Sequence, residues 1–342
     1  MSSPTASAGF RLRSEPEDFE VDEIALYAPS GEGGHTFLHV EKRLRTTEEV
    51  ARALARLAGV PPREVGYAGR KDRVAVTRQW FSVPGVEPET ALAFGMPGVR
   101  VLEAARHGHK LRTGQLRGNR FQIVVRGVDD TLAARAEERL AGLLRVGMPN
   151  RFGEQRFGRD GGNVAEGLAL LRGERVRGRP PDRRALRFAV SALQSAVFNE
   201  ALARRPVALD ALEAGDLAEV HASGGVFRVE DLAAEAPRAA AGEVSATGPI
   251  FGSRTLEPTG EPLARERAAM AAHGLDPDAP LPRVPGLRLR GARRAFRVFP
   301  TEAGIAREGG ALRLRFTLPA GSYATVLLEE ILGTPEDDEG PA

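Results

Sequence analysis

The sequence predicts a protein of the α/β (α+β) class, with a mixed, mainly antiparallel sheet and a second α/β domain inserted into the first. Three observations support this prediction. The chain has 342 residues, more than a single hydrophobic core usually organises. Strand-like alternation and helical periodicity follow each other along the chain, and both return near its end after a poorly patterned middle. Short hairpin-like connections favour antiparallel pairing over a doubly wound parallel sheet.

Two strands are predicted near the N-terminus. Alternating apolar residues indicate a short strand from Phe19 to Ile24 and a second strand at His35–Lys42. The glycine-rich loop Gly31–Gly34 lies between them, as in a hairpin connection. The sequence therefore predicts that these two strands form a hairpin.

A helix and a loop follow. Thr46-Thr47-Glu48-Glu49 is a capping box that precedes apolar residues at helical spacing, and Gly59 and Pro61 end the helix. Strands are predicted at Val65–Ala68 and Gln79–Val83. The segment Gly69–Thr77 is therefore a loop between strands, where catalytic groups are often placed.

The remaining elements are predicted from the same two periodicities. Helices are expected at Thr131–Val146, Arg183–Ala203 and Tyr323–Leu332, and strands at Leu217–Val220, Gly225–Val229, Phe121–Val125, Phe296–Phe299 and Leu312–Leu318. The stretch Pro206–Pro300 is rich in Ala, Gly, Pro and charged residues, and its pattern is the least informative part of the sequence.

Composition excludes several classes of protein. Hydrophobic residues make up 42% of the chain and charged residues 27%, which is ordinary for a globular protein. The absence of cysteine excludes disulfides, thiolate metal sites and thiol nucleophiles. No stretch approaches the ~18 apolar residues of a membrane span, and no apolar leader is evident. A cytoplasmic protein without a membrane partner is expected.

The distribution of charge favours a polyanionic partner. The formal net charge is only +2, yet Val99–Arg126 carries +6 and Arg172–Arg187 carries +5. Two basic segments on a nearly neutral chain are typical of a nucleic-acid-binding face. General arginine enrichment of a proteome explains this composition equally well. Only three of the 48 basic residues are lysines, namely Lys42, Lys71 and Lys110.

The most informative segment runs from Gly66 to Ser82 and contains Gly69-Arg70-Lys71-Asp72-Arg73. It closely resembles the catalytic signature of the TruD family of tRNA pseudouridine synthases, whose recurring residues correspond to Lys71, Asp72, Ala75, Thr77 and Gln79. The resemblance implies that Asp72 is the catalytic residue. It also implies an isomerase that needs neither cofactor nor metal, because pseudouridine formation changes no oxidation state and transfers no outside group. As an alternative, Asp72 only caps a turn.

The same resemblance implies how Asp72 works. Its carboxylate either attacks C1′ of the ribose or removes a C2′ proton, and both routes require the ionised form. Desolvation by a bound nucleotide opposes ionisation, and a nearby cation favours it. In the family the partner of this Asp is a basic residue ahead of the motif Pro16-Glu17-Asp18-Phe19-Glu20-Val21-Asp22-Glu23, which corresponds to Arg13 here.

A second family motif runs from Lys110 to Phe121. By resemblance, Phe121 stacks on a flipped uracil and Asn119 contacts it in the base pocket. From the pattern alone, Phe121 is equally well a core residue at a strand start. Four basic residues of this motif are candidates for RNA contact, together with Lys71: Lys110, Arg112, Arg117 and Arg120.

A third family motif, Pro149–Gly158, interleaves aromatic residues with arginines, which suits stacking and phosphate contact. It makes Arg151 and Arg156 candidates for RNA contact. The alternative is a buried loop that packs Phe152 and Phe157. Segments at Ser191–Asn199 and Leu318–Thr325 also match the family and are expected to be scaffold.

The five ordered motifs imply the family's domain arrangement. We expect a pseudouridine synthase catalytic domain at 1–148 and 293–333, an inserted TRUD domain at 149–292, and a disordered tail at 334–342. The expected substrate is tRNA, modified at the uridine of position 13, and no obligate protein partner is evident.

Two other functions remain open. A non-catalytic tRNA-binding or RNA-folding protein would share the basic segments but would not require Asp72 in its motif. A zinc enzyme is disfavoured, because the pairs His35 and His39, and His107 and His109, lack further ligands at a suitable spacing.

Overall fold

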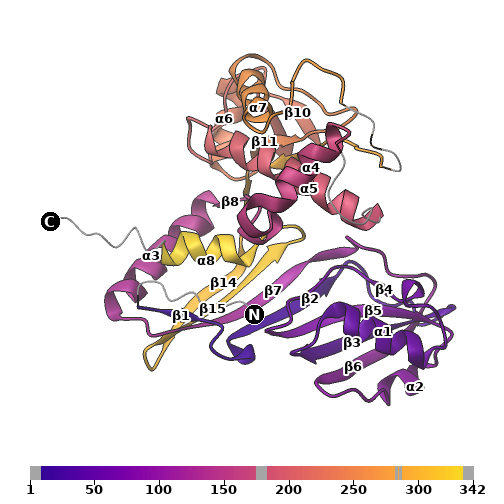
Figure 1. Ribbon diagram of the computed structural model, residues 1–342. Helices are drawn as coiled ribbons and strands as arrows, with labels where there is room; N and C mark the ends of the chain where they lie inside the picture. Colours follow the sequence, from indigo (N-terminus) through magenta and orange to yellow (C-terminus); the bar gives the residue numbers. More distant parts are fainter. Residues whose placement is uncertain (1–8, 175–182, 282–283, 285–286, 334–342) are drawn as a thin grey trace. The chain divides into compact units, whose positions relative to one another are not determined.

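A computed structural model of the protein describes residues 9–174, 183–281, 284 and 287–333 (Figure 1). The chain divides into two compact units. The first takes the chain up to Ala141, then Pro300–Gly321 and the residues from Ile331 on, and the second comprises Gly142–Phe299 and Ser322–Glu330. The second unit thus interrupts the first along the sequence. The predicted tail at 334–342 lies outside the described residues.

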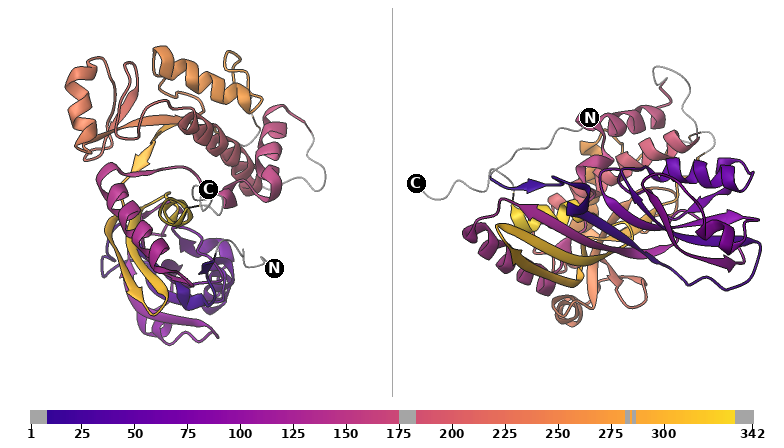
Figure 2. Two further views of the ribbon diagram at one scale, coloured as in Figure 1. Left: turned by 90° about the vertical axis from the view of Figure 1, so that its left-hand side faces the viewer. Right: turned by 90° about the horizontal axis from the view of Figure 1, so that it is seen from below.

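The first unit is built on one sheet (Figures 1 and 2). Its described strands are β1 (Arg11–Leu12), β2 (Phe19–Ala25), β3 (His35–Arg43), β4 (Gly66–Tyr67), β5 (Val76–Pro84), β6 (Val99–His107), β7 (Leu116–Arg126), β14 (Thr301–Glu308) and β15 (Ala311–Pro319). They follow the order β14-β15-β7-β2-β5-β3-β6, with β1 beside β7 and β4 beside β5. Within this part of the chain, β2 and β5 are parallel and the other pairs are antiparallel. The predicted mixed, mainly antiparallel α/β fold is confirmed.

The predicted hairpin between the first two strands is wrong. In the described sheet, β5 lies between β2 and β3, parallel to the former and antiparallel to the latter. Residues on both faces of β5 are buried, including Thr77, Phe81 and Ser82. A strand that is buried on both faces is favoured at the centre of a sheet. The glycine-rich loop Gly31–Gly34 therefore indicates a turn but does not predict which strands pair.

The predicted helix after β3 is present as α1 (Thr47–Leu57). Its capping box forms as expected, because Thr46 Oγ1 accepts from Glu49 N at 3.2 Å and Glu49 Oε2 accepts from Thr46 N at 2.7 Å. The buried face of the helix, with Val50 and Leu54, packs in one cluster with Leu38 and Phe81 of the sheet. Burial of this face stabilises the helix more than propensity does.

Two further helices accompany the first sheet in sequence. The short α2 (Pro88–Leu92) packs beside β6, and the longer α3 (Asp130–Val146) follows β7. The predicted helix at 131–146 matches α3 closely. Single 3-10 turns occur at Pro16–Asp18, Pro62–Glu64, Glu154–Arg156 and Arg159–Gly161.

The second unit has its own core. Its elements are β8 (Met148–Pro149), α4 (Gly162–Leu171), α5 (Arg183–Ala203), β9 (Leu217–Val220), β10 (Val226–Arg228), α6 (Leu232–Ala240), β11 (Val244–Ile250), α7 (Gly260–Ala272), β12 (Ala292–Ala295), β13 (Arg297–Val298) and most of α8 (Ala324–Leu332). Four strands form a sheet in the order β10-β9-β11-β12. Val190, Leu193, Val197 and Phe198 of α5 lie in its core, as the helical pattern predicts.

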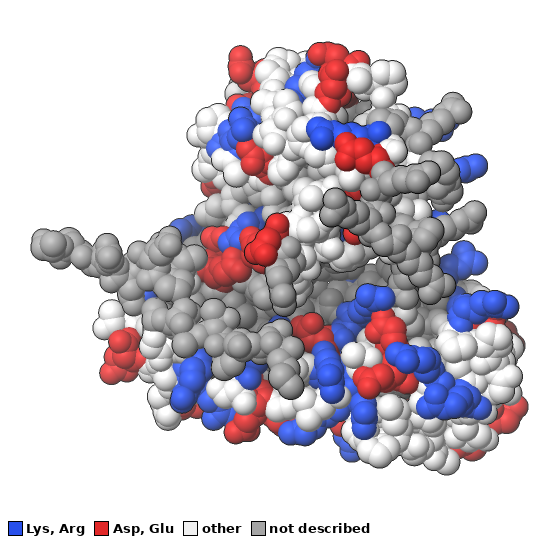
Figure 3. Space-filling model, viewed as in Figure 1, with Lys and Arg blue, Asp and Glu red and all other residues white. Residues whose placement is uncertain are grey.

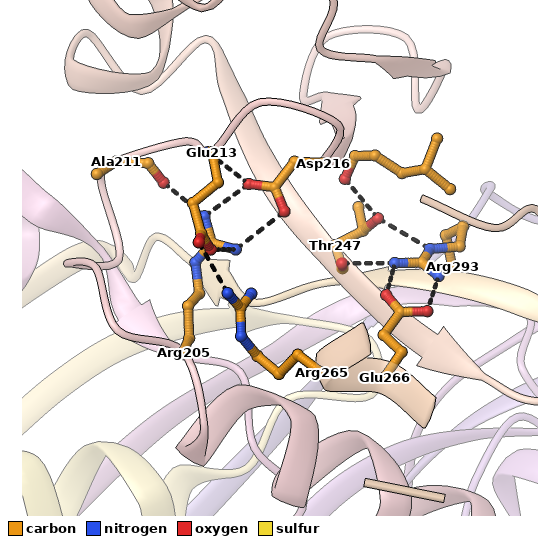
Figure 4. Close-up of polar contacts among 9 residues, drawn as sticks. Arg205, Ala211, Glu213, Asp216, Thr247, Arg265, Glu266 and Arg293 are labelled. Carbon is orange, nitrogen blue, oxygen red and sulfur yellow. Dashed lines mark hydrogen bonds and ion pairs between the residues drawn. The ribbon is translucent and has the colours of Figure 1, made fainter. Parts of the chain in front are cut away.

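Charged side chains are also buried in the second unit (Figure 4). Arg205 pairs with Asp216 at 2.8 Å and with Glu213 at 3.2 Å, and Arg265 also pairs with Glu213. Because each charge has an opposite partner, the cluster avoids the large penalty of an isolated buried ion. Because its charges pair with one another within the second unit, we regard this network as structural.

Candidate active site

The segment that carries Asp72 is a loop between β4 and β5 in the first unit. Two buried side chains, Gln79 and Thr47, hold its backbone. Gln79 Nε2 donates to Gly69 O at 3.1 Å, and Lys71 N donates to Thr47 Oγ1 at 3.0 Å. Thr47 Oγ1 in turn donates to Gln79 Oε1 at 2.7 Å. The loop is therefore tied to both α1 and β5.

Lys42 provides a third anchor for this loop. Its ammonium group donates to Asp72 O at 2.7 Å, to Lys71 O at 3.4 Å and to Arg45 O at 2.8 Å. The side chain belongs to β3 and is 1% exposed. Burial lowers the pKa of Lys42 from its ordinary value of 10.5 to about 8, although the carboxylate of Asp72 opposes this shift.

Lys71 points away from solvent. Its ammonium group forms an ion pair with Glu23 of β2, and the two side chains are 7% and 1% exposed. Glu23 also accepts a hydrogen bond from Trp80 N at 3.2 Å. The sequence suggested Lys71 as an RNA contact, but a buried and paired ammonium group does not present its charge to a phosphate.

The structure brings Asp72 and Arg13 together. Arg13 Nη2 lies 3.0 Å from Asp72 Oδ2, and the side chains are 33% and 46% exposed. Ion pairs at this exposure contribute about 0–1 kcal/mol to stability. The pair is therefore better explained by the positive charge that Arg13 places beside the carboxylate of Asp72 than by a contribution to stability.

The backbone of Arg13 has an unusual conformation. Its φ is 57°, in the left-handed region, which costs roughly 1–2 kcal/mol for a residue other than glycine. The guanidinium lies 4.1 Å from the centre of the Phe19 ring, a cation–π contact. Strained residues held by their surroundings occur often at functional sites.

Aromatic rings continue from this cation into the sheet. Phe19 meets Phe121 edge to face at 6.3 Å, and Phe121 stacks on Phe316 at 5.2 Å. Phe121 is 7% exposed. Phe121 is therefore a core residue of β7 that is linked through Phe19 to Arg13, and its stacking on a uracil stays a prediction.

Two buried polar atoms near this sheet face lack a hydrogen-bond partner in the described part of the chain. They are Asn119 Oδ1 and Thr77 Oγ1. Asn119 pairs with Glu23 in the sheet register, and Thr77 pairs with Val21. Buried polar groups are usually satisfied, so such exceptions in a native protein need an explanation.

The other RNA candidates of the first unit differ in their surroundings. Arg112 and Arg117 are exposed, and Arg117 Nε donates to Leu26 O at 3.2 Å. Lys110 donates to Arg63 O, and Arg120 is paired with Glu302 at 3.0 Å. Figure 3 shows acidic and basic side chains lying next to each other on the visible face of this unit. Many basic charges are thus partly neutralised by neighbours.

The RNA candidates of the second unit are held by protein groups. Arg151 pairs with Glu329 at 2.6 Å and with Glu330 at 3.0 Å. Arg156 donates to Ser191 Oγ and lies over the ring of Phe188 at 5.1 Å. Much of the basic segment Arg172–Arg187 lies outside the described residues.

The histidines form no metal centre in the part of the chain that the structure describes, where no group of three or more potential ligands comes together. His107 and His109 contact each other at 3.3 Å, and His39 stacks on Trp80 at 4.9 Å. These contacts pack His39, His107 and His109 against neighbouring rings. Among the described helices, none is both long and apolar enough to cross a bilayer.

Sequence reasoning missed three residues of the site, namely Lys42, Glu23 and Thr47. A signal for Lys42 was present, because side chains alternate along a strand and Lys42 shares the face of Leu38 and Val40. A lysine on an apolar face is unexpected unless it has partners. Glu23 ends the Pro16–Glu23 motif, but nothing local indicates that it meets Lys71.

The fold and the site together define a class of protein. It is an α+β protein whose second unit is inserted into the first, and the first unit holds one carboxylate beside a guanidinium group on a loop fixed by buried side chains. A solved structure from Methanosarcina mazei, assigned as tRNA pseudouridine synthase D (TruD), has the same fold. Its TM-score is 0.70 at 22% identity, with 98% of this chain and 97% of that chain covered.

Sequence comparison gives the family. The family model for tRNA pseudouridine synthase D (TruD) matches residues 2–176 and 182–331. The tRNA pseudouridine synthases D of Anaeromyxobacter dehalogenans (strain 2CP-C) and Thermus thermophilus are 45% and 44% identical to this chain. The matches cover 98% and 97% of this chain, and 95% and 94% of those proteins. The chain therefore belongs to the TruD family.

Proposed function

We propose that this protein isomerises a uridine of tRNA to pseudouridine and that Asp72 is its nucleophile. The observation that carries the proposal is the contact of Asp72 with Arg13 at 3.0 Å, on a loop that buried side chains hold in place. The family of the chain and the names of its relatives support the activity. The residue roles rest on the geometry and on the motif.

Arg13 is proposed to keep Asp72 ionised when a nucleotide displaces water from the site. An opposite charge within hydrogen-bond distance favours the charged form of a carboxyl group, whereas desolvation opposes it. The ionised oxygen is required whether it attacks C1′ or removes a C2′ proton. A neutral amide at position 72 would support neither route.

The uracil is proposed to leave the RNA stack and enter a pocket bordered by Asn119 and Phe121. The glycosidic bond must break and re-form at C5, which is impossible while the base is stacked and paired. Asn119 Oδ1 is buried and without a partner among the described residues, so it suits an N–H donor such as uracil N3–H. Phe121 is only 7% exposed, so it contributes mainly an apolar wall.

The exposed residues Arg112 and Arg117 are proposed to contact tRNA phosphates. The charge of Arg117 is not neutralised by its contact with a backbone carbonyl. Lys110, Arg120, Arg151 and Arg156 would have to exchange present partners for phosphates, which reduces their contribution. The proposed target is the uridine at position 13, as the family motif implies.

The test compares wild type with Asp72→Asn on tRNA transcripts. Wild type should form pseudouridine at position 13 with a chelator present, and a transcript with cytidine at that position should stay unmodified. Asp72→Asn should form none and still bind tRNA as wild type does. A non-catalytic RNA-binding protein is the alternative, and it is favoured if wild type binds tRNA but leaves every uridine unchanged.

A further inference from the structure

A buried cation lies directly behind the catalytic loop. Lys42 is 1% exposed, and its ammonium group contacts three backbone carbonyls, two of which belong to Lys71 and Asp72. The third is Arg45 O, in the segment that leads into α1. This lysine therefore joins the loop of Asp72 to the start of a rigid helix.

The number of contacts matches the chemistry of an ammonium group. It has three N–H donors and no acceptor, and here three carbonyl oxygens surround it at 2.7, 2.8 and 3.4 Å. A neutral amine has only two N–H donors and a lone pair that would face a carbonyl oxygen. The arrangement is thus complete only while Lys42 is charged.

Stability alone does not explain this charge. Replacing buried ionic groups by apolar side chains of similar size is often neutral or stabilising. Burial lowers the pKa of Lys42 to about 8. The nearby carboxylates of Asp72, Glu48 and Glu49 favour its charged form and the ammonium of Lys71 opposes it. The charge is retained at a position where folding disfavours it.

We propose that Lys42 is a positioning residue for Asp72, which fixes the backbone of the catalytic residue through its carbonyl oxygen. This inference rests on the proposed function of Asp72. The side chain of Lys42 acts through the loop and contacts no substrate. Its loss should therefore lower the rate of the chemical step and leave tRNA binding unchanged.

The experiment measures kcat and KM for tRNA modification with Lys42→Met and Lys42→Arg. Lys42→Met should lower kcat on the order of 10²-fold with KM unchanged, because small displacements of a catalytic group cost about this much. Lys42→Arg should recover part of kcat, since guanidinium also donates to carbonyl oxygens. Arg43→Met is the matched control: Arg43 is the next residue of β3, is exposed and pairs with Glu17, so kcat should stay at the wild-type value.

The pH profile provides a readout that a purely structural residue would not change. In wild type, kcat should fall above pH 8 as Lys42 loses its proton, and Lys42→Arg should remove this fall because its guanidinium stays protonated. A wild-type kcat that is constant from pH 7 to 9 would overturn the proposal. A kcat of Lys42→Met equal to that of wild type would also overturn the proposal. If Lys42→Met does not fold, the pH profiles of kcat for wild type and Lys42→Arg are sufficient to test the proposal.

Hydrogen exchange of the segment Gly69–Arg73 separates this inference from the proposed function. Lys71 N is bonded to Thr47 Oγ1, so its exchange reports the order of the loop. Exchange should be faster in Lys42→Met than in wild type and unchanged in Arg43→Met. If exchange is faster in Lys42→Met but wild type forms no pseudouridine, the positioning role of Lys42 is supported and the proposed activity is refuted. Unchanged exchange would refute the positioning role whatever the activity.

Discussion

Removal of the negative charge of Glu23 should destabilise the first unit strongly. Glu23 and Lys71 are 1% and 7% exposed and form a direct ion pair. Glu23→Gln keeps the size and one acceptor for Trp80 N, but leaves the ammonium group of Lys71 buried without a counter-charge. Breaking a buried pair in this way costs about 3–5 kcal/mol.

The assay is urea unfolding followed by tryptophan fluorescence. The chain has a single tryptophan, Trp80, which lies on β5 beside Glu23 and so reports the first unit. Urea slopes are about 1–3 kcal/mol per M and rise with size, so the midpoint should fall by roughly 1–2 M. Glu17→Gln is the control, because Glu17 and Arg43 form a pair that is about half exposed, which contributes about 1 kcal/mol or less.

The double variant Glu23→Gln with Lys71→Met completes the experiment. It removes both charges, so much of the lost stability should return. Equal midpoints for Glu23→Gln and Glu17→Gln would refute the reasoning, because they would mean that the Lys71 charge reaches water when its partner is removed.

Three further predictions follow from the site. Thr77→Val should raise the free energy of unfolding by about 1 kcal/mol in the same assay, because it removes a buried hydroxyl with no partner in the described chain and keeps the shape; a loss of stability would show that the hydroxyl is bonded. Lys42 has a folded pKa of about 8, below its ordinary value, so the unfolded state binds more protons between pH 8 and 10 and deprotonation favours folding. The stability of wild type relative to Lys42→Met should therefore rise by about 2 kcal/mol across this window, and an unchanged difference would contradict the shift. Affinity for tRNA should fall steeply with salt, measured by filter binding between low and physiological ionic strength, whereas a flat response would contradict phosphate contact through Arg112 and Arg117.

Local signals in the sequence predicted local structure well. The capping box at Thr46 and Glu49 located the start of α1 to the residue, since its hydrogen bonds join groups three positions apart. The apolar spacing of α5 located its buried face. Pairing between strands is a different problem, because alternation shows that a strand exists but not which strand lies beside it. The misassigned hairpin between β2 and β3 has this cause.

The site was predictable only in part for the same reason. Asp72 and Arg13 are 59 positions apart, and only the resemblance to a family suggested their contact. Lys71 was among the candidates for RNA contact. Its burial depends on Glu23 of β2, a partner 48 positions away that no local pattern indicates.

The contrast between the two ion pairs explains how the site combines order with reactivity. The Lys71 and Glu23 pair is buried and fixes the loop, whereas the Arg13 and Asp72 pair is partly exposed and contributes little to stability. The exposed pair can therefore be altered without disturbing the buried one. Substitution of Arg13 should then change catalysis with little effect on folding, while substitution of Glu23 should change both. The backbone of Asp72 is held by Lys42 through its carbonyl oxygen, so the position of this residue does not depend on the contact of its side chain with Arg13 alone.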